Sequence, residues 1–516
     1  MNIVMLTDGA VNVVNVPSKT AFLQLRASRP VTLSGTAKSA GDHMTTKQIF
    51  LADYLDRVKW TPRDLAHAVN GWLEIRGRIS EQIHPTTPYH WLSKGFCPYP
   101  PYPTVVAEVL STALGTVITP HDIWPGKVPA TRPPATAVDN LAAAWNPDDV
   151  LSQIADLVRH PQEGCVQVGG PQLIASALDG IRHSPCRVMD AASGEPVRPA
   201  LMTLIARHIA DLRLLDDRAG GGALNLRYVS NELHAVLDLL RNATSTADVR
   251  ERLLLAAADL AQLSGWMHWD AGNHGAGQRY LLLAIRAARA AAESHQPSIR
   301  AVAIESAANS LGMLAYQSAH SGHPADAVRL AEAAAARARK ATPATRARLA
   351  GRLATAHAAA GDVHAFRDAA EQARDLLDKR TVDDAPPFLY YLNTDQLDAE
   401  AGQALVDLAG QNPAESKHLL GEAVELLTPL TSAGLRAEYQ RSALLHGCYL
   451  VEAHLKQHDL EAAVAAARAA TARLAGVQSV RCRTLIRRLR RAFARRARNP
   501  YVADLLPELD DALHTA

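Results

Sequence analysis

Polar side chains that can read nucleic-acid bases are concentrated in one short segment near the N-terminal end of the chain. A helix is expected to begin at Thr87-Pro88, because threonine followed by proline is a typical helix start. On this helix Trp91 and Leu92 would face the core, leaving the polar side chains outward. Threonine and histidine can hydrogen-bond base edges in the major groove of DNA, and lysine can pair with a phosphate or a guanine. The outward set comprises Thr86, Thr87, Tyr89, His90, Ser93 and Lys94.

Three arginines could add contacts to the DNA backbone. Arg63 lies at the start of the preceding helix, which Thr61-Pro62 should begin, where free N–H groups would assist a phosphate contact. Arg76 and Arg78 follow that helix. However, residues 44–127 contain eight Lys/Arg against seven Asp/Glu, a weak excess for a DNA-binding domain. Two copies in a dimer would therefore be needed, and a small helical domain without a DNA role is the alternative.

A series of five short helices is expected to position these residues between 47 and 126. The first carries a helical stripe of apolar residues (Phe50, Leu51, Tyr54, Leu55 and Val58). Two helices follow at Thr61-Pro62 and Thr87-Pro88, and a proline-rich connector leads to the fourth helix, which should end at Gly115. Thr119-Pro120 should begin a short fifth turn. Helices two and three of this bundle would form a helix-turn-helix.

The segments on either side of this bundle (residues 44–126) lack its regular pattern. Residues 1–43 have no helical period, so a hairpin, a disordered tail and a true start at Met44 are all open. Residues 127–139 form a Pro/Ala-rich linker. Residues 140–247 are expected to be an irregular helical connecting region, interrupted at 169–170 and 220–222 by glycines.

From residue 248 to 516 the sequence becomes self-similar. Alanine- and leucine-rich helices are separated by small turns about 40–50 residues apart, in the range of helical-hairpin repeats. The turns are expected at 271–273, 321–323, 360–362 and 457–459, with a weaker one at 411–413. This spacing predicts an α-solenoid of tetratricopeptide-like hairpins, and an ordinary α-bundle is the alternative. An arginine-rich helix, with nine arginines in residues 481–498, would cap the array and present a solvated face, or else a surface for phosphate or an acidic partner.

The concave groove of such an array commonly takes peptides or helices, and here a small molecule or another protein could also bind. The candidate anchors are polar or aromatic residues, each of which could instead serve packing. They are Trp266, Trp269, Asn309, Tyr316, Tyr390, Tyr391, Asn393 and Tyr449.

Composition supports an all-α fold and excludes several functional classes. Aromatic residues make up only 5% of the chain, and its apolar residues are mostly alanine and leucine. Five scattered cysteines without a CxxC pair indicate a reducing compartment such as the cytoplasm, with neither a disulfide framework nor a zinc site. No apolar stretch is long enough for a membrane span, and no secretory signal is recognisable.

No pattern of catalytic, metal-binding or cofactor-binding residues is recognisable. The chain lacks a Ser/His/Asp elbow, an HExxH motif and an EF-hand loop, so no enzyme activity and no cofactor are predicted. The glycines at 220–222 should be a helix connector. His268, His274, His320 and His323 lie beside repeat turns and are expected to be solvent-exposed residues rather than metal ligands.

The five-helix series, with Trp91-Leu92-x-x-Gly95 in its third helix, resembles actinobacterial XRE/Cro-type helix-turn-helix regulators with C-terminal tetratricopeptide-like repeats. The resemblance is closest to the NsdA-type subgroup, which shares the long insert between helices two and three (residues 72–84). It also extends to the turn at 119–124 and to the segment 214–222. Pro88 and the insert depart from a simple pattern, so base contacts cannot be transferred residue by residue.

Two functions follow as expectations. The first is a cytoplasmic, nucleoid-associated transcription regulator, a repressor of development or secondary metabolism by resemblance, which binds double-stranded DNA as a homodimer. In this case the repeats would supply dimer contacts and sense a signal. The second is a tetratricopeptide-type interaction scaffold whose N-terminal bundle does not bind DNA.

Overall fold

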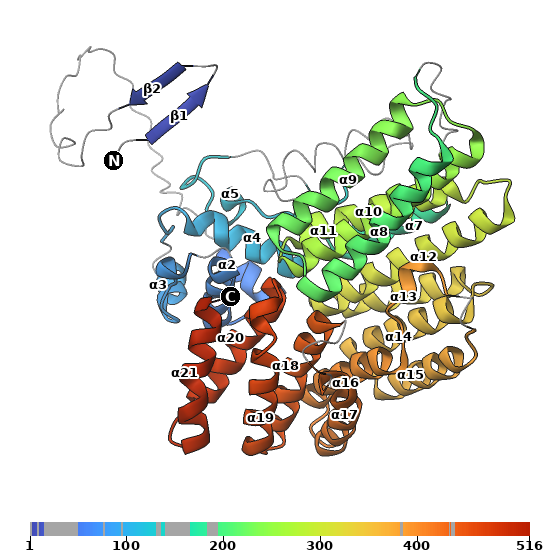
Figure 1. Cartoon of the computed structure of the whole chain (residues 1–516). Coiled ribbons are helices and arrows are strands. Elements are labelled where there is room, and N and C mark those ends of the chain that lie inside the picture. Colours follow the sequence, from blue (N-terminus) through green and yellow to red (C-terminus); the bar gives the residue numbers. More distant parts are fainter. Residues whose placement is uncertain are drawn as a thin grey trace, which may run out of the picture. The chain divides into compact units, whose positions relative to one another are not determined.

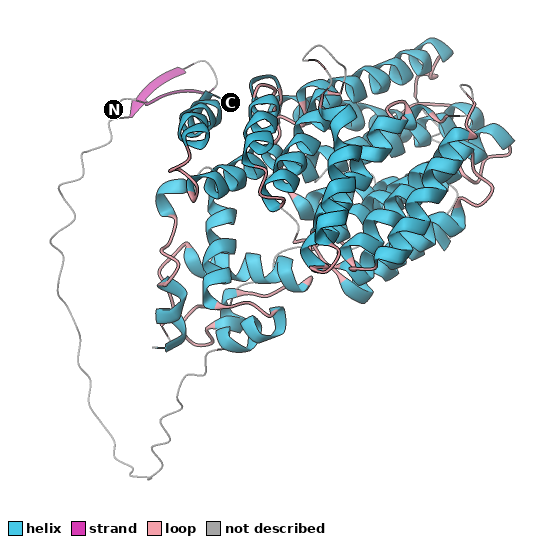
Figure 2. Cartoon of the chain, turned by 90° about the horizontal axis from the view of Figure 1, so that it is seen from below, coloured by secondary structure: helices cyan, strands magenta, loops and turns pink. Residues whose placement is uncertain are grey.

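The computed structural model confirms an all-α architecture for the residues that it describes after position 49. It describes residues 3–7, 10–14, 50–75, 78–93, 96–130, 136–139, 166–182, 194–381, 385–432, 434 and 439–515. The chain divides into two units, Met1–Thr46 and Lys47–Ala516. In the first unit, β1 (Ile3–Thr7) pairs antiparallel with β2 (Ala10–Val14), which matches the hairpin alternative. In the second, every regular element described is a helix (Figures 1 and 2).

The second unit begins with the predicted five-helix bundle, which also contains the 3-10 turn η1 (Ile79–Glu81). Its helices are α1 (Leu51–Val58), α2 (Pro62–Ile75), α3 (Thr87–Ser93), α4 (Tyr102–Leu114) and α5 (Pro120–Ile123). Thr61 and Thr119 each form a capping box with the aspartate three residues later, so two predicted helix starts are confirmed. Gly115 ends α4 with a φ of 63°, as expected for a left-handed C-cap.

The described residues of the region that was expected to be an irregular helical connection contain three helices. They are α7 (Gly170–Arg182), α8 (Pro199–Ala219) and α9 (Ala223–Asn242). Helix α8 packs against both α10 and α18, so it lies across the repeat array rather than leading up to it. The glycines at 220–222 connect α8 to α9, as predicted. Their small size lets this turn approach Gln478, whose carbonyl oxygen would lie 2.8 Å from a Cβ at Gly220.

The repeat array consists of consecutive antiparallel pairs of helices (Figure 1). The pairs are α10 (Ala247–Asp270) with α11 (His274–Ala291), α12 (Pro297–His320) with α13 (Pro324–Arg337), α14 (Pro343–Ala359) with α15 (Val363–Asp378), α16 (Thr394–Gln411) with α17 (Ser416–Thr431), α18 (Gln440–Lys456) with α19 (Leu460–Thr471), and α20 (Val480–Ala494) with α21 (Pro500–Thr515). Two 3-10 turns lie between pairs, η2 (Pro387–Leu389) and η3 (Leu474–Gly476). The first helices of successive pairs also pack against one another, which gives the array its continuous alanine- and leucine-rich core.

All five predicted turns fall between the two helices of a pair. Gly272, Gly322 and Gly361 adopt φ values of 80–81°, and His458 adopts 63° at the equivalent place. A left-handed residue reverses the chain in two or three residues, which brings the two helices of a hairpin together. The small turns recognised in the sequence therefore reflect the left-handed backbone conformation that four of these turns adopt.

The described residues correct one expectation, which concerns the histidines beside the turns, and agree with another, which concerns the arginines of α20. His268 is 1% exposed and stacks on Tyr280, and His320 is bonded to Gln403, so neither is a solvent-exposed turn residue. On α20, the arginine face is partly solvated, as expected, since the side chains of Arg488 and Arg491 are each 57% exposed. Arg490 binds Asp510, as the nearby acidic residues suggested.

Two other arginines of α20 bind the five-helix bundle. Arg491 Nη2 lies 2.7 Å and Arg487 Nε 3.4 Å from the carboxylate of Glu74, near the C-terminal end of α2. Glu74 is only 8% exposed. The last pair of the array therefore contacts the predicted DNA-binding bundle through a half-buried ion cluster.

No helix among the described residues is both long and apolar enough to cross a membrane.

Candidate functional site

The first candidate site is the outer face of α3. Trp91 is 3% exposed and its ring centroid lies 6.3 Å from that of Tyr102, so the inner side of α3 is fixed in the bundle core. Helix α3 packs against α2. This arrangement leaves one side of the short helix facing outward, as the sequence predicted.

The structure places most of the predicted base-contacting residues on this outer face. Thr86, Tyr89, His90 and Ser93 are exposed, and Thr87 is half-buried. Helix α3 begins at Thr87, and the amide of Tyr89 donates to the carbonyl oxygen of Thr86, so Thr87 lies within the helix rather than capping it. Lys94 lies outside the described residues.

The predicted phosphate-contacting arginines have different environments. Arg63 is exposed at the first turn of α2, next to the capping box of Thr61 and Asp64. Arg78 donates two hydrogen bonds to Glu81, at 2.6 and 2.7 Å, so its charge is already matched within the chain. Arg76 lies outside the described residues.

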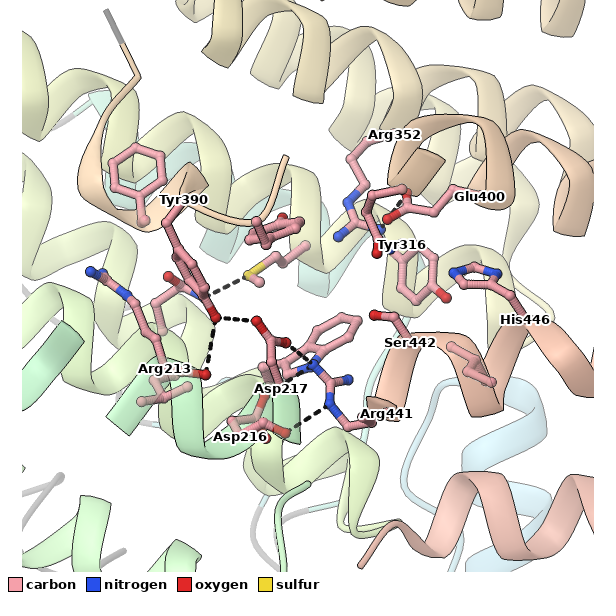
Figure 3. Close-up of a pocket in the computed structure, with 18 residues that line it drawn as sticks. Arg213, Asp216, Asp217, Tyr316, Arg352, Tyr390, Glu400, Arg441, Ser442 and His446 are labelled. Carbon is pink, nitrogen blue, oxygen red and sulfur yellow. Dashed lines mark hydrogen bonds and ion pairs between the residues drawn. The ribbon is translucent and has the colours of Figure 1, made fainter. Parts of the chain in front are cut away.

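The second candidate site is a cavity between α8 and the first helices of the repeat pairs (Figure 3). The cavity volume is about 70 Å³, within about 650 Å³ of space between atoms that includes open solvent. Helices α8, α10, α12, α14, α16 and α18 and the segment 388–391 contribute to its wall. The residues labelled in Figure 3 are Arg213, Asp216, Asp217, Tyr316, Arg352, Tyr390, Glu400, Arg441, Ser442 and His446.

One end of the cavity carries two adjacent carboxylates on α8. Arg441 Nη2 lies 3.1 Å from Asp216 Oδ2 and 2.9 Å from Asp217 Oδ1, so both acids share one guanidinium. The hydroxyl of Tyr390 donates to Asp217 and lies 3.0 Å from the carbonyl oxygen of Arg213 (Figure 3). Burial raises the pKa of Asp216 to about 7, and the charges of Asp217 and Asp270 add to this, against the opposing effect of Arg441.

The other end carries the carboxylate of Glu400 and the guanidinium of Arg352, and the fully buried Arg348 supports them from outside the lining. Glu400 accepts from Arg348 Nη1 at 3.0 Å and from Arg352 Nη1 at 3.4 Å. Burial disfavours the charge of Glu400, but the two arginines outweigh it and hold its pKa at about 2. The end of the cavity at α8 therefore has more acidic than basic groups, whereas the opposite end has more basic than acidic groups.

Aromatic rings and cations line the wall between these two ends. The guanidinium carbon of Arg352 lies 4.3 Å from the ring centroid of Tyr316, and those of Arg352 and Arg441 lie 5.8 and 5.5 Å from that of Trp266. Such cation–π contacts orient the guanidiniums and leave the rings as rigid surfaces. In this part of the wall, the arginine and aromatic side chains thus hold one another in position.

The structure separates the eight groove candidates into three groups. Trp266, Tyr316, Tyr390 and Tyr391 line the cavity. Asn393 caps α16 by accepting from the amide of Gln396. Trp269, Asn309 and Tyr449 are buried, with 3%, 4% and 7% exposure, and Tyr449 lines a separate polar cavity beside His320.

Sequence reasoning missed the charged residues of the cavity. Asp216 and Asp217 lie in the region read as a connector, and Arg441 follows them by more than 220 residues. The available signal was an Asp-Asp pair in a helix, which is usually a solvated feature. Only the packing of α8 across the array makes the pair part of a site.

A comparison with protein families finds one match. Residues 51–124 match the family model described as SP15 N-terminal domain, which covers α1 to α5 and well under half of the chain. No curated protein matches the chain.

Proposed function

We propose that this protein is a sequence-specific, double-stranded-DNA-binding regulator of transcription that acts as a repressor. The observation that carries the proposal is the outer face of α3. Its side chains of Tyr89, His90 and Ser93 are exposed, while Trp91 holds the opposite face in the core. A helix of this kind, packed on a preceding helix, can present its N-terminal half to the major groove. The resemblance to XRE/Cro-type regulators supports the same reading.

The proposed regulator binds as a homodimer in the cytoplasm, at the nucleoid. The reason is electrostatic, because residues 44–127 have an excess of one positive charge and Arg78 is already paired with Glu81. Few phosphates can be neutralised by a single copy, so two half-sites are needed for useful affinity. The repeat array would supply dimer contacts and respond to a signal.

The same charge balance favours one alternative function. A bundle with few free cations suits a protein-interaction scaffold, in which the array binds a partner and α3 has no DNA role. The two functions differ in a property that can be measured directly, namely salt-sensitive preference for one DNA sequence.

The test uses the purified full-length chain with its own promoter region and with random DNA of equal length. The regulator should prefer the promoter region, with an affinity that falls as salt rises. Changing Thr87, His90 and Lys94 together to alanine should lower specific affinity by about 100-fold or more, because each of the three base contacts contributes about 1–3 kcal/mol and about 1.4 kcal/mol is tenfold.

The matched control is Thr104→Ala, which changes an exposed residue at the first turn of α4 and should leave DNA binding unchanged. The helical content and melting of each variant report whether the array stays folded. Equal affinity for promoter and random DNA, or full activity of the triple variant, would favour the scaffold. Mapping of the sites occupied in cells would then show whether symmetric sequences recur.

A further inference from the structure

The acidic end of the cavity has more negative charge than its protein partners balance. Asp216 and Asp217 share the guanidinium of Arg441, since Arg213 forms its ion pair with Asp259, at 3.0 Å. Asp216 is only 3% exposed. Two buried carboxylates beside one cation leave an unbalanced charge, which a protein stabilises with a further cation or by protonation.

The unpaired polar atoms of the cavity wall call for hydrogen-bond donors. Among the described residues that line the cavity, Asp216 Oδ1, Gln396 Oε1, His446 Nδ1 and Arg213 Nη2 have no hydrogen-bond partner and are shielded from solvent. Of these four atoms, Arg213 Nη2 is matched by its ion pair with Asp259. Burial lowers the pKa of His446 to about 4, so its ring is neutral at pH 7. The carboxylate and amide oxygens can only accept hydrogen bonds, so an occupant must bring N–H or O–H groups to them.

The mouth of the cavity is largely apolar and aromatic, while Arg352 and Glu400 form an ion pair at the opposite end. Leu263, Met313 and Phe388 lie with the rings of Tyr390 and Tyr391 around the cavity. The two tyrosine rings meet edge to face, with centroids 5.6 Å apart. Tyr390 is 36% exposed, which places it at the mouth of the cavity. Rigid aromatic rings around an acidic pair are a typical arrangement for an organic cation.

We propose that this cavity binds a small organic ammonium compound. Its protonated amine hydrogen-bonds and ion-pairs with Asp216 and Asp217, and its apolar or aromatic body lies against the rings at the mouth. The proposal deepens the sensing role of the repeat array within the proposed function. It does not depend on DNA binding, because the array and the cavity are the same whether or not α3 reads DNA.

The position of the cavity also connects an occupant to the five-helix bundle. Tyr316 lines the cavity, and its hydroxyl accepts a hydrogen bond from Arg481 at the start of α20. Further along α20, Arg487 and Arg491 bind Glu74 of α2. A ligand that moves Tyr316 would therefore act on α20 through Arg481, and α20 in turn contacts the five-helix bundle.

The test is calorimetric titration of the full-length protein, without DNA, with three amines: tryptamine, phenethylamine and cadaverine. Indole-3-propionate and indole serve as the anionic and neutral counterparts of tryptamine. At least one amine should bind, and tryptamine should bind about tenfold or more tightly than indole-3-propionate and indole. Binding should also release protons at pH 7, since burial raises the pKa of Asp216 to about 7 and the ammonium group favours its ionised form. Titration in buffers of different ionisation enthalpy measures this release.

Asp216→Asn should weaken amine binding about tenfold or more and abolish the proton release, with little effect on indole. The matched control is Asp368→Asn, an exposed carboxylate on α15 that lies outside the cavity. If Asp216→Asn lowers the melting temperature so that its binding cannot be measured, the proton release on amine binding to the unchanged protein tests the proposal instead. Tighter binding of indole-3-propionate than of tryptamine, or no binding of any amine at millimolar concentration, would overturn the proposal. A lack of promoter preference in the separate DNA assay would contradict the proposed regulator function and would leave the proposal of amine binding intact.

Discussion

Replacing Glu400 with glutamine should destabilise the repeat array strongly although the shape of the side chain is kept. Glu400 is 9% exposed and is the shared partner of Arg348, which is fully buried, and of Arg352. Glutamine removes the negative charge and leaves two guanidiniums in a site from which water is largely excluded. An unmatched buried charge is among the most costly defects that a single substitution creates.

Two arguments give the same magnitude. Loss of one partner of a buried ion pair costs about 3–5 kcal/mol. The pKa of Glu400 falls from about 4.5 in an unfolded chain to about 2 in the fold. At 1.36 kcal/mol for each pKa unit, this difference corresponds to about 3 kcal/mol. Because the folded pKa is the lower one, this stability is fully present above about pH 4.5 and is lost as the pH falls toward 2.

Urea unfolding at pH 7, followed by circular dichroism, measures the change in free energy of unfolding. A double-mutant cycle with Arg348→Met isolates the pair, and the double variant should be more stable than the sum of the two single losses predicts. Glu422→Gln is the control, because its pair with Arg367 is partly exposed and should contribute less than about 1 kcal/mol. A loss below about 1 kcal/mol for Glu400→Gln, or strict additivity in the cycle, would refute the electrostatic argument.

Two further predictions concern the contacts of the five-helix bundle. Glu74→Gln should weaken the ion pairs with Arg487 and Arg491 on α20, at a cost of about 1–3 kcal/mol in the free energy of unfolding. Amide hydrogen exchange should then become faster in both α2 and α20. Unchanged exchange in α20 would show that the ion cluster does not hold the two helices together. Gly115→Ala should lower stability by more than about 1 kcal/mol, because φ is 63° and the new Cβ would lie 2.7 Å from the amide of Gly169. Gly322 also has a positive φ, but a Cβ added there would meet no atom within 4 Å, so Gly322→Ala creates the backbone strain without the close contact. Equal melting temperatures of the two variants would therefore show that the contact with Gly169 does not contribute.

Local signals in the sequence determined much of the secondary structure. Thr61-Pro62 and Thr119-Pro120 start helices through their own capping boxes, which need only the next three residues. The small turns at 271–273 and 321–323 each need one left-handed residue. Requirements of this kind lie within one turn of chain, so residue types alone report them. The outward face of α3 follows from the same local periodicity.

The cavity could not be read from the sequence, because its residues meet only through packing. Asp216 and Arg441 are 225 positions apart, and no periodicity in either helix indicates that α8 lies across α18. The same holds for Glu74 and Arg491, separated by 417 positions. A buried charge is stable only where its partner is brought to it, and that partner is chosen by the tertiary fold. The sequence by itself therefore determined the helices, the turns and the candidate reading face of α3, whereas tertiary structure alone decided which charges became buried pairs and where the cavity lies.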